Sequence, residues 1–205
     1  MEPNLRAGVA IYNAGERHAA HDAWEDEWLD RESGTDGERL LHGLIQFTAA
    51  IYHGYRGNWS GLRGLAESGA GYLADLPPEY RGVNVEEVRA YLRALAADPE
   101  HVERVAPPAL THGGEALALD DLGPEATFVA ADVLAEEHGY DEAVVERAVE
   151  FARADLAAGD ERSPFVTFLF DFVREESHRD IVAQRLSEHV ERRAAEQGDV
   201  EGLFE

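Results

Sequence analysis

The sequence predicts an all-α fold, a multi-helix bundle with a small irregular or β-hairpin insert near residues 106–122. Apolar residues recur at every third or fourth position through most of the chain, which is the period of a helix with one buried face. No proline interrupts the chain between Asn4 and Leu76, so a long helical block is expected there. Prolines and paired glycines gather instead between residues 98 and 123, where the helical period is lost.

The first two helices are predicted over residues 4–16 and 17–31. The turn SGTDG, residues 33–37, separates them from a third helix. Thr35 or Asp36 is placed to cap that helix, because short polar side chains accept hydrogen bonds from the first free backbone N–H groups.

Gly57 and Asn58 end the third helix and begin a fourth, which runs to Leu76 and stops before two prolines. The fourth helix carries a stripe of small residues on one side: Gly61, Gly64, Ser68 and Gly71. Each glycine inside a helix costs about 1 kcal/mol relative to alanine. The stripe therefore predicts a close approach by another helix backbone.

A short amphipathic helix is predicted over residues 85–97. The segment that follows, residues 98–123, is an irregular linker in which Gly113-Gly114 can form the turn of a hairpin. These breaks predict a helical bundle over residues 1–97, the linker, and C-terminal helices over residues 124–197 that pack on the bundle or extend it.

Helix boundaries are also visible in the C-terminal part. Pro124 suits a first helical position, and Gly139 suits a C-terminal stop. Asp141 is placed to cap the next helix, and Ser163-Pro164 opens another. The polar run at residues 174–180 predicts a break before the final helix.

The charge of the chain is extreme. There are 42 acidic residues against 18 basic ones, a formal net charge of -24, and every basic residue is an arginine. At 44% hydrophobic residues the chain can still build a core, so a folded protein with an acidic surface suited to high salt is expected. Nucleic acid is not expected as a partner, because binding to its continuous phosphate backbone needs concentrated positive charge.

The remaining composition argues for a soluble, cytoplasmic protein. There are no cysteines, which excludes disulfides and thiol chemistry. The first residues lack the pattern of a signal peptide, and no apolar run approaches the roughly 20 residues of a membrane span. Membrane partners are therefore not expected, whereas a homo-oligomer is possible.

A polar seam is predicted where the second and third helices pack. On the second helix four residues share one face by their spacing: His21, Trp24, Glu25 and Trp28. On the third helix a polar stripe borders the apolar one: His42, Gln46, Ala49 and His53. The seam is the candidate site.

Two functions are compatible with this seam. The first is a non-catalytic binding or interaction module without a cofactor, built on a buried polar network. Its members are expected to be His21, Glu25, Gln46 and Asn58, walled by Trp24, Trp28 and Tyr52. The small-molecule ligand of such a site is unknown.

The alternative is a metal-dependent hydrolase in which a divalent metal binds His21, Glu25 and His42. The spacing of His21 and Glu25 lets an imidazole and a carboxylate reach one ion, although it is also common for simple ion pairs. No nucleophile motif, phosphate loop or zinc-type cysteine pair supports another catalytic class.

The motifs AHDAWEDEW (Ala20 to Trp28) and HGLIQFTAAIYHGYRGN (His42 to Asn58) resemble domain-of-unknown-function family 309. The residues that fit the family pattern are His21, Glu25, Trp28, Gly43, Leu44, Ile45, Gln46, Gly57 and Asn58. Asp22 stands where the family has glutamate, and the match covers about Leu5 to Leu76. The resemblance implies a helical bundle but no activity. The acidic, lysine-free composition further resembles proteins of halophilic archaea, so the chain resembles a halophilic archaeal version with an additional helical C-terminal region.

Overall fold

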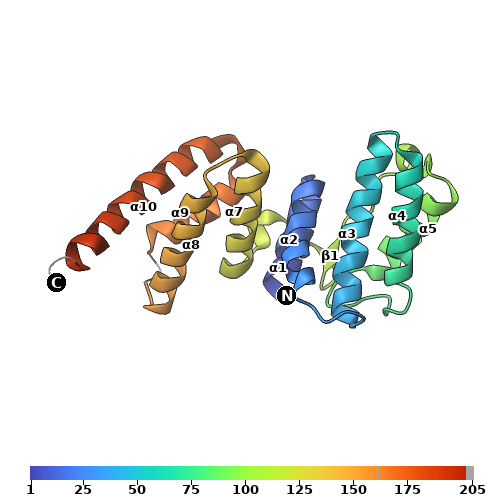
Figure 1. The fold of residues 1–205 in the computed structure, drawn as a ribbon, viewed down its shortest axis with the longest axis horizontal. Coiled ribbons are helices and arrows are strands. Elements are labelled where there is room, and N and C mark those ends of the chain that lie inside the picture. Colours follow the sequence, from blue (N-terminus) through green and yellow to red (C-terminus); the bar gives the residue numbers. More distant parts are fainter. Residues whose placement is uncertain (161, 202–205) are drawn as a thin grey trace. The chain divides into compact units, whose positions relative to one another are not determined.

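The fold is described by a computed structural model for residues 1–160 and 162–201, with side chains described through Gln197. The chain divides into two compact units, unit 1 (Met1–Leu122) and unit 2 (Gly123–Glu205). Helices dominate both units, and the only strands in the described residues form one small hairpin (Figure 1). The prediction of an all-α fold with a hairpin insert is confirmed.

Unit 1 is a succession of helices in which each packs on the next, from α1 to α5 (Figure 1). Its elements are α1 (Glu2–Asn13), α2 (Arg17–Leu29), α3 (Asp36–Tyr55), α4 (Trp59–Tyr72), α5 (Val85–Ala97), α6 (His101–Arg104), β1 (Thr111–His112), β2 (Glu115–Ala116) and η1 (Leu119–Asp121). The core is aliphatic and aromatic, with fully buried side chains that include Leu5, Ile11, Trp24, Leu40, Leu44, Phe47, Ile51, Leu62 and Leu73.

The helix ends of unit 1 follow local side-chain chemistry. The Thr35 side chain accepts a hydrogen bond from the backbone N–H of Glu38 and begins α3. Asn58 does the same for Gly61 and begins α4. In the hairpin, Thr111 pairs with Ala116 across Gly113 and Gly114, whose φ angles of 66° and 85° lie in the left-handed region.

The predicted close approach along the small stripe of α4 is wrong at two of its glycines. A Cβ atom added at Gly64 or Gly71 would meet nothing within 4 Å. The tight contact lies on another side of α4, where a Cβ at Gly69 would lie 3.0 Å from the Cβ of Gln46 and 3.4 Å from the carbonyl oxygen of Gly43. The buried stripe of α4 runs through Leu62, Ala66 and Gly69, so the side that carries Gly64 faces away from α3.

Unit 2 contains α7 (Pro124–His138), α8 (Glu142–Ala157), α9 (Pro164–Arg174), η2 (Glu176–His178) and α10 (Arg179–Glu201). The apolar helix α9 packs against α7, α8 and α10. Gly139 ends α7 with a φ of 71°, and Asp141 and Ser163 cap the two helices that follow. The predicted break in the polar run is confirmed, since α9 ends at Arg174 and α10 begins at Arg179.

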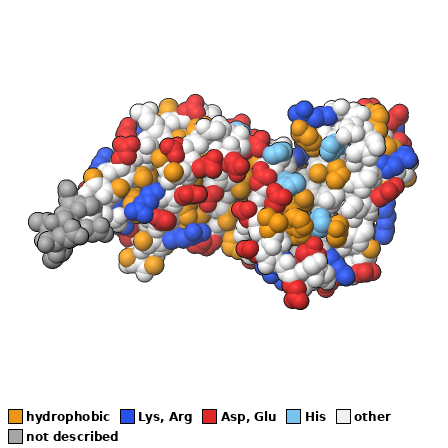
Figure 2. Space-filling model, viewed as in Figure 1, with side chains coloured by type: hydrophobic (Ala, Val, Ile, Leu, Met, Phe, Trp, Pro, Cys, Tyr) orange, Lys and Arg blue, Asp and Glu red, His pale blue; other side chains and the backbone are white. Residues whose placement is uncertain are grey.

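On the face that Figure 2 shows, acidic side chains are spread over both units, and histidine side chains gather on unit 1. Within the described ranges, no helix is long and apolar enough to cross a membrane.

Candidate functional site

A small hollow lies where α2 packs beside the second half of α3. Its volume is about 170 Å³, and it is lined by Arg17, His18, His21, Thr48, Ala49, Tyr52 and His53. Arg17 and His21 are four residues apart on α2, and Ala49 and His53 are four apart on α3, so each pair faces the same side of its helix. The side chain of Ala49 is small, which leaves room for the hollow. The Thr48 hydroxyl donates its hydrogen bond to the carbonyl oxygen of Ile45 at 2.9 Å.

Arg17 is the unusual member of the lining. Its guanidinium carbon lies 5.7 Å from the ring centre of Tyr12 and 5.6 Å from that of Tyr55, so aromatic faces hold the cation. Its Nε atom is buried and has no hydrogen-bond partner, and no carboxylate in the described part of the chain pairs with it. By contrast, Arg31 and Arg193 each pair with an acidic side chain.

The tyrosine beside Arg17 does not supply the missing negative charge. Burial raises the pKa of Tyr12 above its ordinary value and outweighs the opposing effect of Arg17, so the phenol stays protonated. Its hydroxyl donates to the carbonyl oxygen of Pro108 at 2.9 Å. Arg17 is therefore a cation whose charge is stabilised by rings but not neutralised.

His53 presents a hydrogen-bond donor through its Nε2 atom. The Oδ1 atom of Asn58 accepts from the backbone N–H of Gly61 at 3.0 Å, which fixes the orientation of the amide. The Asn58 Nδ2 atom then donates to Nδ1 of His53 at 2.7 Å. Since Nδ1 accepts, the proton of the neutral ring sits on Nε2.

Two further imidazoles line the hollow, and each lies beside a carboxylate one helical turn away. His21 Nε2 is 3.6 Å from Glu25 Oε2, and His18 Nδ1 is 3.6 Å from Asp22 Oδ2. The side chains of His21 and Glu25 are 28% and 43% exposed. The seam is thus in contact with solvent, and the prediction of a buried network is wrong in this respect.

The four polar residues expected to meet do not form one network. Within the described residues Glu25 has no hydrogen bond with Gln46 or Asn58. The Asn58 side chain instead caps α4 and donates to His53. Gln46 lies on the side of α3 that packs against Gly69 of α4, and no described group hydrogen-bonds its amide.

Of the three predicted walls, Tyr52 lines the hollow and the two tryptophans do not. Trp24 is fully buried against Gly8 of α1, and its indole N–H donates to the carbonyl of Leu5 at 3.4 Å. The indole N–H of Trp28 donates to Glu38 at 2.9 Å. Both tryptophans therefore pack α2 against its neighbouring helices and do not form part of the candidate site.

His42 belongs to a separate cluster around Glu38. Its Nδ1 atom is 3.2 Å from Glu38 Oε1, and its ring centre lies 3.8 Å from that of Tyr72 and 4.5 Å from that of Trp28. Burial alone would raise the pKa of Glu38, but hydrogen bonds from Trp28, the Gly34 backbone and His42 outweigh it and lower that pKa.

The predicted metal set of His21, Glu25 and His42 is therefore not assembled. His42 lies eleven positions before His53 on α3, which is about 16 Å along a helix, so the two cannot serve one site with His21. The ligand atoms that the structure does bring together are those of His21, Asp22 and Glu25, which all lie within 4.8 Å of one another.

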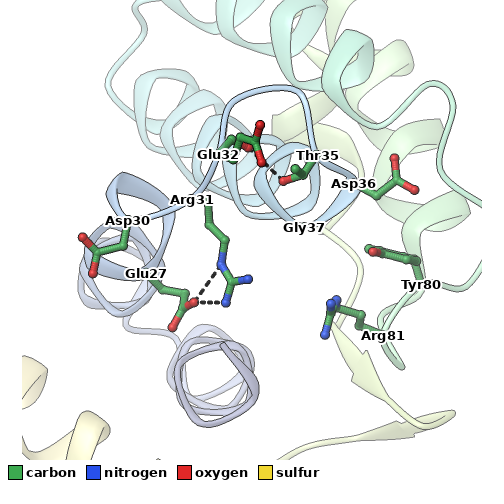
Figure 3. Close-up of a pocket in the computed structure, with 9 residues that line it drawn as sticks. All are labelled: Glu27, Asp30, Arg31, Glu32, Thr35, Asp36, Gly37, Tyr80 and Arg81. Atoms are coloured by element: carbon green, nitrogen blue, oxygen red, sulfur yellow. Dashed lines mark hydrogen bonds and ion pairs between the residues drawn. The ribbon is translucent and has the colours of Figure 1, made fainter.

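A second, wider hollow of about 570 Å³ opens between the end of α2, the start of α3 and the turn after α4 (Figure 3). Arg31 pairs with Glu27 at its edge, and Arg81 reaches toward it from a left-handed backbone position with a φ of 49°. Its lining is mixed in charge: Glu27, Asp30, Arg31, Glu32, Thr35, Asp36, Gly37, Tyr80 and Arg81. Because acidic groups outnumber the guanidiniums, this hollow indicates no single ligand chemistry.

Sequence reasoning missed Arg17 and His18 as site residues. Both precede His21 by three or four positions on the same helix, so the helical period that grouped His21 with Glu25 also places them on that face. The lack of a hydrogen-bond partner for Arg17 Nε has no signal in the sequence.

Comparison with known proteins places a family model on this part of the chain. The model, described as a domain of unknown function (DUF309), matches residues 5–65, which include every residue that lines the smaller hollow. An uncharacterized protein of Aquifex aeolicus (strain VF5) is 25% identical over 96 residues, which are 47% of this chain and 28% of that protein. The chain thus spans less than a third of that relative's length. The first helices of unit 1 are similar to this family of unknown function.

Proposed function

We propose that the protein is a non-catalytic binding module whose hollow between α2 and α3 takes a small oxyanion. One observation carries the proposal: Arg17 lines the hollow with a buried, unpartnered Nε atom in a chain of net charge -24. Leaving a buried donor unsatisfied costs about 1–3 kcal/mol. An anion in the hollow would neutralise the guanidinium charge.

The other lining groups suit the same ligand. The Nε2–H of His53 is a second donor, and the Tyr52 hydroxyl is a third. His18 and His21 line the same hollow, and each imidazole can offer an N–H group to a ligand there. The hollow is therefore rich in donors.

The size of the hollow limits the ligand. Its volume of about 170 Å³ equals on the order of five water molecules. That is below the range of about 300–1,000 Å³ that is typical of sites for drug-sized ligands. A phosphate or carboxylate group fits, either as a free ion or as the end of a larger molecule that projects into solvent.

The test is a calorimetric titration of the full chain with inorganic phosphate, in molar potassium chloride to keep the acidic protein folded. We expect saturable binding that becomes at least about tenfold weaker in Arg17→Met, since a charge-assisted hydrogen bond contributes about 1.5–3 kcal/mol. The matched control is Arg93→Met, because Arg93 is exposed and removal of its charge leaves the hollow unchanged. Equal affinity in the two variants, or no saturable binding by the unmodified protein, would refute the proposal.

The acidic composition also indicates the salt concentration at which the protein works. We propose that the protein works at high salt, where a carboxylate-rich, lysine-free surface remains soluble and its self-repulsion is screened. The composition resembles that of halophilic archaeal proteins, which would fit a function in a concentrated cytoplasm.

A further inference from the structure

The exposed edge of the hollow carries three potential metal ligands on a single helix. One ligand atom each from His21, Asp22 and Glu25 lies within 4.8 Å of the other two. Ligands bound side by side at about 2.1 Å from one ion lie about 3 Å apart, and ligands on opposite sides lie about 4.2 Å apart. Small rotations of these half-exposed side chains are enough to reach such separations.

The charges and supporting contacts of the three residues suit a divalent cation. Two carboxylates neutralise its charge, and the strongly acidic chain attracts cations in general. The Nδ1 atom of His18 lies 3.6 Å from Oδ2 of Asp22, and carboxylates that bind metals commonly have a polar neighbour of this kind.

We propose that His21, Asp22 and Glu25 form a binding site for a divalent transition-metal ion at the edge of the hollow. One imidazole nitrogen with two carboxylate oxygens selects ions such as Mn²⁺, Fe²⁺ or Zn²⁺ over Mg²⁺ and Ca²⁺, which prefer oxygen ligands alone. Three protein ligands leave open positions for water or for another ligand. The site differs from the expected set, since Asp22 takes the place of His42.

This inference goes beyond the anion site and does not rest on it. The two sites share His21, whereas Arg17 and His53 belong to the anion site alone, and Asp22 and Glu25 to the metal site alone. An experiment on the two carboxylates therefore leaves the test of Arg17 intact.

The test is a titration of the full chain, purified without a histidine tag and treated with a chelator, with Mn²⁺ in molar potassium chloride. High salt suppresses loose attraction of Mn²⁺ to the acidic surface. The electron paramagnetic resonance signal of free Mn²⁺ measures binding. We expect one site per chain, which excess Mg²⁺ does not displace, and a loss of at least about tenfold in affinity in Asp22→Asn and in Glu25→Gln.

Two controls make the result specific. His178→Ala removes an exposed histidine whose Nδ1 lies 3.9 Å from Glu175, a pair to which the described residues bring no third ligand, so this variant should bind Mn²⁺ as the unmodified protein does. Arg17→Met should bind Mn²⁺ at least as tightly as the unmodified protein, because it removes a positive charge and no proposed ligand. Broadening of the His21 ring signals by substoichiometric Mn²⁺ gives a readout that needs no variant.

The metal site is refuted if Asp22→Asn and Glu25→Gln bind Mn²⁺ as tightly as the unmodified protein, or if the His21 signals stay sharp. Loss of phosphate binding in Arg17→Met with normal Mn²⁺ binding would support both sites. Failure of Mn²⁺ binding alone would leave the anion site standing.

Discussion

The contact between α1 and α2 is the most sharply testable part of the fold, because it holds the helix that carries Arg17 and His21. A Cβ atom at Gly8 would lie 2.1 Å from Nε1 and 2.3 Å from Cε2 of Trp24. The indole is fully buried and donates to the Leu5 carbonyl, so it cannot swing into open space. Gly8→Ala must therefore push the two helices apart or displace the ring.

The size of the effect follows from opposing contributions. Overpacking costs about 1–3 kcal/mol, and contacts this short belong at the upper end of that range. Loss of the indole hydrogen bond adds about 1 kcal/mol, while alanine recovers about 1 kcal/mol of helix propensity. We expect Gly8→Ala to lower the free energy of unfolding of unit 1 by about 3 kcal/mol.

The assay is urea unfolding followed by tryptophan fluorescence, which reports on unit 1 alone because Trp24, Trp28 and Trp59 all lie in it. The matched control is Gly64→Ala, also inside a helix, where the added Cβ meets nothing within 4 Å. That variant should gain up to about 1 kcal/mol. If Gly8→Ala is as stable as the unmodified protein, or if both variants shift in the same direction, α1 does not pack on Trp24 as described.

Four further outcomes are expected. Glu38→Gln removes the carboxylate that accepts hydrogen bonds from Trp28 and the Gly34 backbone, and it should lower the free energy of unfolding by about 2 kcal/mol at pH 7. Because the folded-state pKa of Glu38 is lowered, the difference in unfolding free energy between the variant and the unmodified protein, measured by urea unfolding, should shrink as the pH falls below about 4. Asn58→Ala should cost about 1 kcal/mol through the lost helix cap and should also weaken phosphate binding, because His53 loses its partner. Burial raises the pKa of Asp132 to about 6, so folding keeps a proton on Asp132 that the unfolded chain releases, and stability falls as the pH rises from about 4 to about 6. Asp132→Asn should therefore stabilise unit 2 in thermal unfolding at pH 8 and make little difference below pH 4, and a gap that does not depend on pH would contradict this. The melting temperature of the unmodified chain should rise from low salt to molar potassium chloride.

The helix ends and the hairpin could be predicted because each depends on a few neighbouring residues. Thr35 and Asn58 satisfy backbone groups within three positions of themselves, and Gly139 supplies a left-handed backbone angle at the end of its own helix. The close approach predicted along the small stripe of α4 is wrong at Gly64 and Gly71, because helical spacing alone does not say which face a neighbouring helix covers.

The sequence predicts where the candidate site lies, but it predicts only some of the residues that line it. Spacing placed His21, Ala49 and His53 in one seam with Tyr52 as a wall, and all four residues line the hollow. It could not show that Trp24 is held by Gly8 of a different helix, or that His42 pairs with Glu38 within its own helix. These contacts depend on how far along each helix its neighbour packs, which one sequence does not specify.

The central claim is that Arg17 is a cation held ready for an anionic ligand. Its most direct test is the nuclear magnetic resonance signal of the Arg17 Nε–H group during titration with inorganic phosphate. We expect this signal to move saturably together with the ring signals of His53, while that of Arg93 stays in place. An Arg17 signal that does not respond while phosphate binds elsewhere, or no saturable response at all, would contradict the claim.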